Sequence, residues 1–141
     1  MFKLMLSLNL FLSVSLTAYG ATECENKLNN AIDAQKEAIS VFNHGSEIYS
    51  HIDLFDGNLV KQCIEYKKSA DSIVESENYF QTASELFSKI SPECEKEIVE
   101  AATLKKAQCD HTISYINNDF NMIQVYNESC LPILKKENQV K

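Results

Sequence analysis

The sequence predicts an all-α domain: an antiparallel three-helix up-down-up bundle of long helices, braced by disulfides, or a four-helix form if the chain breaks at Gly45. Apolar residues recur three or four positions apart along most of the chain, which is helical spacing. The 141 residues include only three glycines and two prolines, too few for the turns of a many-stranded sheet. Five cysteines supply the means of covalent bracing.

The first twenty residues have the features of a signal peptide. Lys3 carries a positive charge, residues 4–16 are mostly apolar, and Ala18 and Gly20 place small side chains where a signal peptidase reads the chain. The apolar run is shorter than the roughly 20 residues of a spanning helix, and no later run matches it, so we expect no membrane span. The predicted organisation is a signal peptide over 1–20, a helical domain over 21–131 and a flexible tail over 132–141.

The composition argues against a nucleic-acid partner. The formal net charge is −7, and all thirteen basic residues are lysine. Arginine, the side chain best suited to bidentate contacts with phosphates and bases, is absent. We therefore expect no nucleic-acid binding.

The first predicted helix begins at the acidic triplet 23–25, whose carboxylates suit the positive end of the helix dipole. Gln35 stands where the rhythm calls for an apolar residue. Gly45 either ends the helix or lies closely packed inside it, and both alternatives are open because the helical phase carries through. The apolar stripe consists of Leu28, Ala31, Ile32, Ala38, Ile39, Phe42, Tyr49, Ile52 and Phe55.

A turn at 56–58 separates the first helix from the second, with Gly57 suited to a left-handed conformation and Asn58 to a helix cap. Ser91 and Pro92 then have the residue types of an N-cap and a first helical position, and they predict the start of the third helix. The second stripe consists of Leu59, Cys63, Tyr66, Ala70, Ile73, Phe80, Ala83, Phe87 and Ile90. The third consists of Cys94, Ile98, Ala102, Cys109, Ile113, Ile116, Phe120 and Ile123, and this helix is expected to fray between residues 127 and 132.

An exported chain with five cysteines is expected to form disulfides, because its compartment is oxidising. Cys24 and Cys94 lie at two helix starts that share one end of an up-down-up bundle, so we predict that they are bonded. Cys63 lies roughly 15 Å along the bundle axis from both Cys109 and Cys130. Because Cys130 is near the expected end of the third helix, where the chain can fold back, we predict a Cys63–Cys130 bond and a buried free thiol at Cys109.

The sequence predicts no catalytic, cofactor or metal site. Cys109 and His111 project about 200° apart on a helix, so they cannot form a nucleophile–base pair. His44, His51 and His111 lack the spacing of metal sites in helical bundles, and we expect them in solvent. Helix-start electrostatics account for the glutamates near two helix starts, which are Glu23, Glu25, Glu93, Glu95, Glu97 and Glu100.

Two functions of different classes fit these features. The first is a secreted or periplasmic binding or structural module that acts through contacts with a protein partner, without catalysis. The second is a carrier of a small apolar ligand or a metal ion between the helices. The triplet 127–129, Asn-Glu-Ser, is a glycosylation sequon, which has a role only in a eukaryotic secretory pathway.

Overall fold

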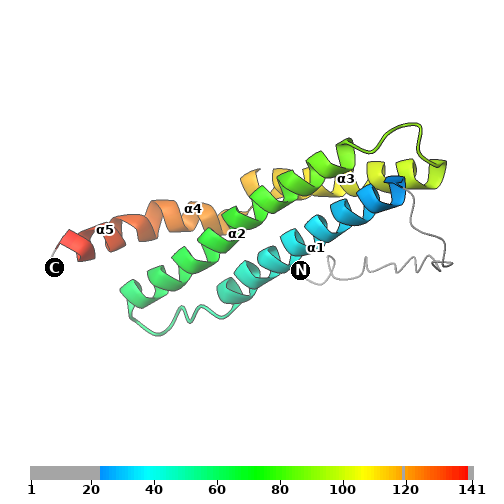
Figure 1. Ribbon diagram of the computed structural model, residues 1–141. Coiled ribbons are helices and arrows are strands. Elements are labelled where there is room, and N and C mark those ends of the chain that lie inside the picture. Colours follow the sequence, from blue (N-terminus) through cyan, green and yellow to red (C-terminus); the bar gives the residue numbers. More distant parts are fainter. Residues whose placement is uncertain (1–22, 119, 140–141) are drawn as a thin grey trace.

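The computed structural model describes residues 23–118 and 120–139, and every regular element in these ranges is a helix (Figure 1). This confirms the predicted all-α fold with three long helices. The predicted signal peptide lies outside the described residues. The elements are α1 (Glu23–Ser50), α2 (Leu59–Ser88), α3 (Lys96–Asn118), α4 (Asn121–Val125), the π-helix η1 (Tyr126–Cys130) and α5 (Leu131–Gln139).

Helices α1 and α2 form a long antiparallel hairpin in which small residues line the contact. On each helix they are buried at intervals of seven residues, so the same face returns after two turns and the two backbones can approach closely. The set consists of Ala31, Ala38 and Gly45 on α1, and of Ser69, Ser76 and Ala83 on α2. Two hydroxyl groups of α2 also donate to carbonyl oxygens of α1: Ser69 to Gly45 at 2.6 Å, and Ser72 to Val41 at 3.0 Å.

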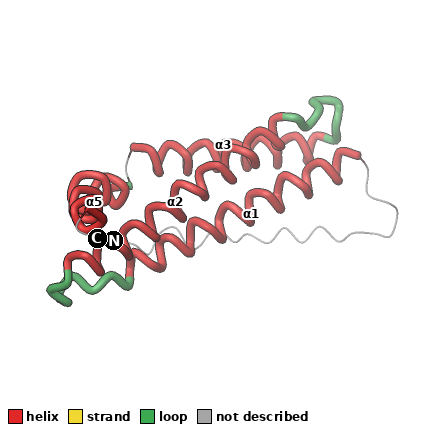
Figure 2. The backbone as a smooth tube through the Cα atoms, turned by 60° about the vertical axis from the view of Figure 1, so that its left-hand side comes forward, coloured by secondary structure: helices red, strands yellow, loops and turns green. Residues whose placement is uncertain are grey.

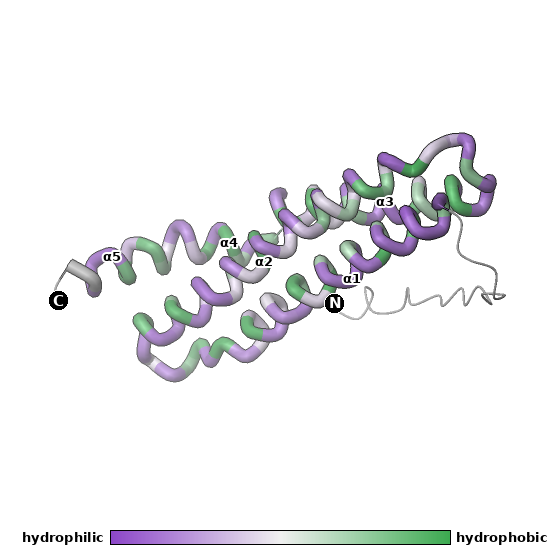
Figure 3. Tube along the Cα trace, viewed as in Figure 1, coloured by the Kyte–Doolittle hydropathy of each residue, from purple (hydrophilic) through white to green (hydrophobic). Residues whose placement is uncertain are grey.

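Gly45 therefore lies inside a continuous helix, and the four-helix alternative is wrong. The glycine is buried against Ser69 and Ile73 of α2. Helix α3 packs against α2, runs antiparallel to it and also contacts α1 (Figures 1 and 2). Hydrophobic and hydrophilic residues alternate along the three helices, as amphipathic helices require (Figure 3).

Helix α3 begins at Lys96, so the predicted start at Ser91 and Pro92 is wrong by four residues. The hydroxyl oxygen of Ser91 accepts the amide of Glu93 at 3.2 Å, and its carbonyl oxygen accepts the amide of Cys94 at 3.1 Å. These bonds close a tight turn instead of a helix. Cys94 lies in this turn and is bonded to Cys24 in the first turn of α1, so the covalent link holds the connection outside the helix.

The end of the chain differs most from the sequence-based expectation. Helix α3 ends at Asn118, and α4, η1 and α5 form a further helical segment that crosses the bundle at a steep angle (Figure 2). The predicted fraying between residues 127 and 132 is wrong, because the chain forms a π turn there and continues as a helix past Pro132. The segment expected as a tail, 132–141, is thus helical as far as Gln139, and its mobility stays a prediction.

The break after α3 brings the second pair of cysteines together. Cys24 is bonded to Cys94 with their Cα atoms 5.8 Å apart, and Cys63 to Cys130 with their Cα atoms 4.9 Å apart. These are the pairs that the sequence favoured. The mismatch in height between Cys63 and Cys130 is removed by the change of direction between α3 and α4, which lays the C-terminal segment across α2. Cys109 is a buried free cysteine.

Candidate functional site

The loop that joins α1 to α2, residues 51–58, combines exposed apolar side chains with a tightly held backbone. We call it the tip loop. Phe55 is 97% exposed and Leu54 is 62% exposed, and Leu59, the first residue of α2, is 61% exposed. The predicted burial of Phe55 and Leu59 on the apolar stripes is therefore wrong. Helix α1 ends at Ser50, before its stripe reaches Phe55.

Local hydrogen bonds explain why α1 stops there. The hydroxyl group of Ser50 and Nδ1 of His51 both donate to the carbonyl oxygen of Glu47, at 2.8 Å in each case. They satisfy a carbonyl group at the helix end that has no amide partner further along the helix. The next residues are thus free to leave the helical path and form the tip loop.

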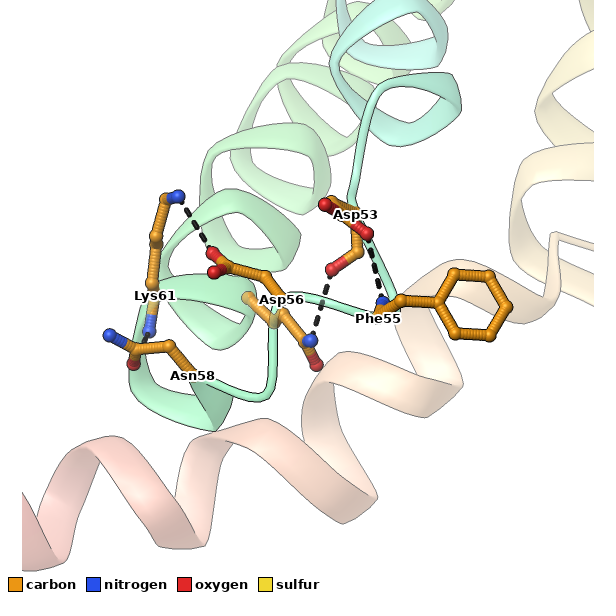
Figure 4. Close-up of polar contacts among 6 residues, drawn as sticks. Asp53, Phe55, Asp56, Asn58 and Lys61 are labelled. Carbon is orange, nitrogen blue, oxygen red and sulfur yellow. Dashed lines mark hydrogen bonds and ion pairs between the residues drawn. The ribbon is translucent and has the colours of Figure 1, made fainter.

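Asp53 holds the conformation of the tip loop from inside (Figure 4). Its carboxylate accepts the backbone amide of Phe55 at 2.9 Å. Its carbonyl oxygen accepts a hydrogen bond from the side chain of Gln62, on α2, at 3.0 Å. Asp53 and the amide of Phe55 are therefore held relative to α2, while the phenyl ring projects away from the loop (Figure 4).

A second set of bonds ties the far side of the loop to α2. The ammonium group of Lys61 lies 2.7 Å from the carboxylate of Asp56, and the side chain of Asn58 caps α2 by accepting the amide of Lys61 at 3.0 Å. The carboxylate of Asp56 raises the pKa of Lys61, so the lysine stays charged. Gly57 has a φ angle of 70°, a conformation that favours glycine. The predicted turn and cap at 56–58 are confirmed.

The tip loop has an excess of negative charge. Between residues 46 and 62 the sequence contains three carboxylates, on Glu47, Asp53 and Asp56, and one ammonium group, on Lys61. Lys61 is already paired with Asp56. The aromatic ring of Phe55 therefore belongs to a segment with a net negative charge.

Two open grooves lie beside the C-terminal segment, with volumes of about 360 and 700 Å³. Both are bordered by Val74 of α2, Ile123 of α4 and Asn127 of η1. The larger one is lined mainly by amide and carboxylate side chains, which are Glu77, Asn117, Asn118, Asn121, Gln124, Asn127 and Glu128. This lining offers hydrogen bonds to a polar group, whereas a carrier of a small apolar ligand needs an enclosed apolar cavity.

The residues considered for metal or thiol chemistry are dispersed. His44, His51 and His111 are all exposed, and Glu23 is paired with Lys27 at 2.6 Å. Within residues 23–118 and 120–139, no group of three His, Cys, Asp or Glu side chains could hold a metal ion. No helix in the same ranges is long and apolar enough to cross a membrane.

Cys109 lies in the core with no exposed surface, near a buried polar side chain of α1. Burial, together with the neighbouring carboxylate of Asp110, raises the pKa of the Cys109 thiol to about 11. Gln35, the polar residue in the apolar rhythm of α1, lies at this level and accepts a hydrogen bond from Lys105 of α3 at 3.3 Å. The thiol and the amide thus belong to the α1–α3 contact and not to a surface site.

Comparison with known proteins gives no relative from which a function could be transferred. No protein-family model, no curated protein and no solved structure matches this chain. The candidate site therefore depends on the geometry of the tip loop alone.

Sequence reasoning missed the tip loop as a site. The signal was present: Leu54 and Phe55 are adjacent, so on a helix they would lie about 100° apart, and the clearest turn triplet of the chain follows them at 56–58. Two large apolar residues placed directly before such a turn are better candidates for an exposed loop than for a buried stripe.

Proposed function

We propose that the mature chain is an exported binding module that docks on a protein partner through the tip loop, without catalysis. The observation that carries this proposal is Phe55, whose ring is 97% exposed on a loop with a hydrogen-bonded backbone. Isolated exposed apolar residues are common on protein surfaces. An aromatic ring on a hydrogen-bonded loop at the end of a long hairpin, with the exposed Leu54 next to it in the chain, has the composition of a binding hot spot.

The energetics favour a ring of this kind as an anchor. Full burial of a phenylalanine side chain contributes about 1.5–3 kcal/mol. The bonds from Asp53 to Phe55 and from Gln62 to Asp53 already order the loop, so docking loses little conformational entropy there. A loop that is ordered before binding keeps more of the burial energy as affinity.

The charges of the segment around Phe55 define the chemistry of the partner. The segment that carries Phe55 includes Glu47, Asp53 and Asp56, and the complementary surface is an apolar pocket with lysine or arginine side chains at its rim. Such rim charges mainly raise the association rate and make it dependent on salt. The net negative charge of this segment also disfavours an anionic lipid surface as the target.

The predicted signal peptide and the two disulfides support a location outside the cell or in the periplasm. Cys24–Cys94 and Cys63–Cys130 are bonds that persist in oxidising compartments, outside the cell or in the periplasm. Together with the absence of a spanning helix among the described residues, they are consistent with a secreted or periplasmic protein.

The test places a photo-crosslinking phenylalanine analogue at position 55. The matched control carries the analogue at Leu104 of α3, which is 62% exposed on a different element. We expect an adduct from position 55 and none from position 104. The captured protein is then purified and titrated with the wild-type chain and with Phe55→Ala.

We expect Phe55→Ala to weaken binding to the purified partner by at least tenfold, because loss of about 1.4 kcal/mol or more corresponds to that factor. High salt should slow association of the wild type. Equal affinity of Phe55→Ala and the wild type, or equal crosslinking from positions 55 and 104, would show that the tip loop is not the docking site.

A further inference from the structure

The sequon at 127–129 is the only Asn-x-Ser or Asn-x-Thr triplet in the chain, although the chain contains many asparagines. It lies within the π-helix η1, between the partly buried Tyr126 and the buried Cys130. All three residues of the sequon are exposed, whereas Tyr126 packs against the core and Cys130 is bonded to Cys63. The π turn therefore directs the whole triplet to the surface.

The side-chain amide of Asn127 makes no hydrogen bond with the part of the chain that the structure describes. The neighbouring Glu128, in contrast, accepts a hydrogen bond from Gln124 at 2.9 Å. Asn127 also borders both open grooves, of about 360 and 700 Å³. The folded chain can thus accommodate a glycan on Asn127 without the loss of a side-chain hydrogen bond.

We infer that Asn127 is the acceptor of an N-linked glycan, added in a eukaryotic secretory pathway. The donor is a lipid pyrophosphate-linked oligosaccharide. A bond forms between Nδ2 of Asn127 and C1 of the first sugar, the bond between C1 and the pyrophosphate oxygen breaks, Nδ2 loses one proton, and the lipid pyrophosphate leaves. The glycan extends over the grooves beside Val74, an apolar side chain that is 45% exposed, and adds soluble bulk at that surface.

The fold also determines whether glycan transfer or closure of the Cys63–Cys130 disulfide comes first. In an extended chain residues two apart point to the same side, so Asn127 and Ser129 are presented together. In the π turn they are not, and the Cys63–Cys130 bond directly beside Ser129 holds the turn in place. Transfer to Asn127 therefore precedes closure of that disulfide. Occupancy of the site should rise when Cys63 and Cys130 are both replaced by alanine.

The experiment translates the full chain in a cell-free system supplied with endoplasmic-reticulum microsomes. We expect the protease-protected chain to run as a heavier form that peptide N-glycosidase converts to the lighter one. Asn127→Gln and Ser129→Ala should abolish the heavier form, and Ser129→Thr should keep it. The matched control Asn121→Gln, an amide of the same groove outside the sequon, should keep it as well.

Peptide N-glycosidase converts a glycosylated asparagine to aspartate when it removes the glycan, so peptide mapping should find aspartate at residue 127. A protected chain without the heavier form would overturn the inference, as would a heavier form that persists in Asn127→Gln. A chain that does not enter the microsomes would overturn it too, because such a chain never meets the transferase. The tip-loop proposal would survive the first two outcomes, since its readout is partner affinity.

Discussion

Gly45 of α1 lies directly against Ile73 of α2. A Cβ atom at position 45 would come within 2.9 Å of both Cγ1 and Cδ1 of Ile73, and within 3.1 Å of the carbonyl oxygen of Ser69. A larger residue at position 45 therefore requires the Ile73 side chain or the backbones of the two helices to move. The hydrogen bond from Ser69 to the Gly45 carbonyl oxygen depends on the same approach.

We expect Gly45→Ala to lower the free energy of unfolding by about 1–2 kcal/mol. Overpacking costs about 1–3 kcal/mol, and the better helix propensity of alanine recovers up to about 1 kcal/mol. Chemical denaturation measures the difference. The control is Asn43→Ala, an exposed position of the same helix, which should leave stability unchanged or raise it slightly. A Gly45→Ala protein as stable as the wild type would mean that α1 and α2 are not in close contact here.

The second prediction is that each disulfide stabilises a different part of the fold. Each bond joins residues about 70 positions apart, and in the chain-entropy model the loss of such a bond costs about 4 kcal/mol. Hydrogen exchange should show faster exchange at the start of α1 in Cys24→Ala/Cys94→Ala. It should show faster exchange across 121–139 in Cys63→Ala/Cys130→Ala. The same exchange pattern in both variants would contradict this assignment.

The elements that the sequence predicts well are those in which local signals and packing agree. Helix α2 has a capping Asn58, a preceding Gly57 and an apolar stripe in one phase, and it begins as expected. The predicted start of α3 is wrong for a different reason. Ser91 and Pro92 are residue types that favour a helix N-terminus, but the disulfide at Cys94 holds this segment in a turn before the helix begins.

The sequence pattern did not predict the break between α3 and α4. Ile116, Phe120 and Ile123 keep helical spacing across it because all three pack in the core, although Ile116 lies on α3, Phe120 between the two helices and Ile123 on α4. The ring centroid of Phe120 lies 5.8 Å from those of Phe42 and Tyr115, so aromatic packing holds the chain where the helix ends. Helical spacing therefore does not show that a helix is continuous. It also does not show where a helix ends, because Phe55 continues the spacing of the α1 stripe although α1 ends at Ser50 and Phe55 is 97% exposed.

The third prediction concerns acid stability at the α2–α3 contact. Lys106 lies 2.5 Å from the carboxylate of Asp110, and the hydroxyl group of Ser84 donates to the same carboxylate at 2.5 Å. Both lower the pKa of Asp110 in the folded state, Lys106 more strongly. The charged carboxylate therefore adds stability above its ordinary pKa, and this contribution is lost as the pH falls through the folded value.

We expect Asp110→Asn to reduce the free energy of unfolding at neutral pH by about 1 kcal/mol, because the carboxylate is partly exposed and its interactions are screened. The difference from the wild type should vanish in acid. Ser84→Ala should show a similar but smaller effect. A difference that stays constant with pH would attribute the loss to packing and not to charge.

The fourth prediction is that the thiol of Cys109 is inert in the native protein. With a pKa of about 11, about one thiol in a thousand is ionised three pH units lower, and the group is fully buried. Iodoacetamide should label Cys109 only after denaturation without reductant, and non-reducing gels should show a monomer. Rapid native labelling, a covalent dimer, or label on a cysteine other than Cys109 would contradict the pairing.

The same thiol should contribute to alkaline sensitivity. Its folded pKa lies above its ordinary value, so its contribution to stability is complete below the ordinary thiol pKa and is lost as the pH rises toward 11. Between these limits the wild type should lose stability faster than Cys109→Ala, which has no proton to release there. If the free energy of unfolding of the two proteins fell equally with rising pH, ionisation of Cys109 would not be a cause of the alkaline loss of stability.

The last prediction separates structure from function at Phe55. Because the ring is 97% exposed, Phe55→Ala should change the free energy of unfolding by less than about 0.5 kcal/mol, although it weakens binding to the partner by at least tenfold. The matched control is Phe80→Ala, at a position 3% exposed in α2, which should cost about 3–5 kcal/mol. Asp53→Ala should also keep overall stability but speed hydrogen exchange at the Phe55 amide, since that amide loses its acceptor. If Phe55→Ala destabilised the protein as Phe80→Ala does, the ring would be part of the core in solution, and a protein partner would have no exposed anchor to bind.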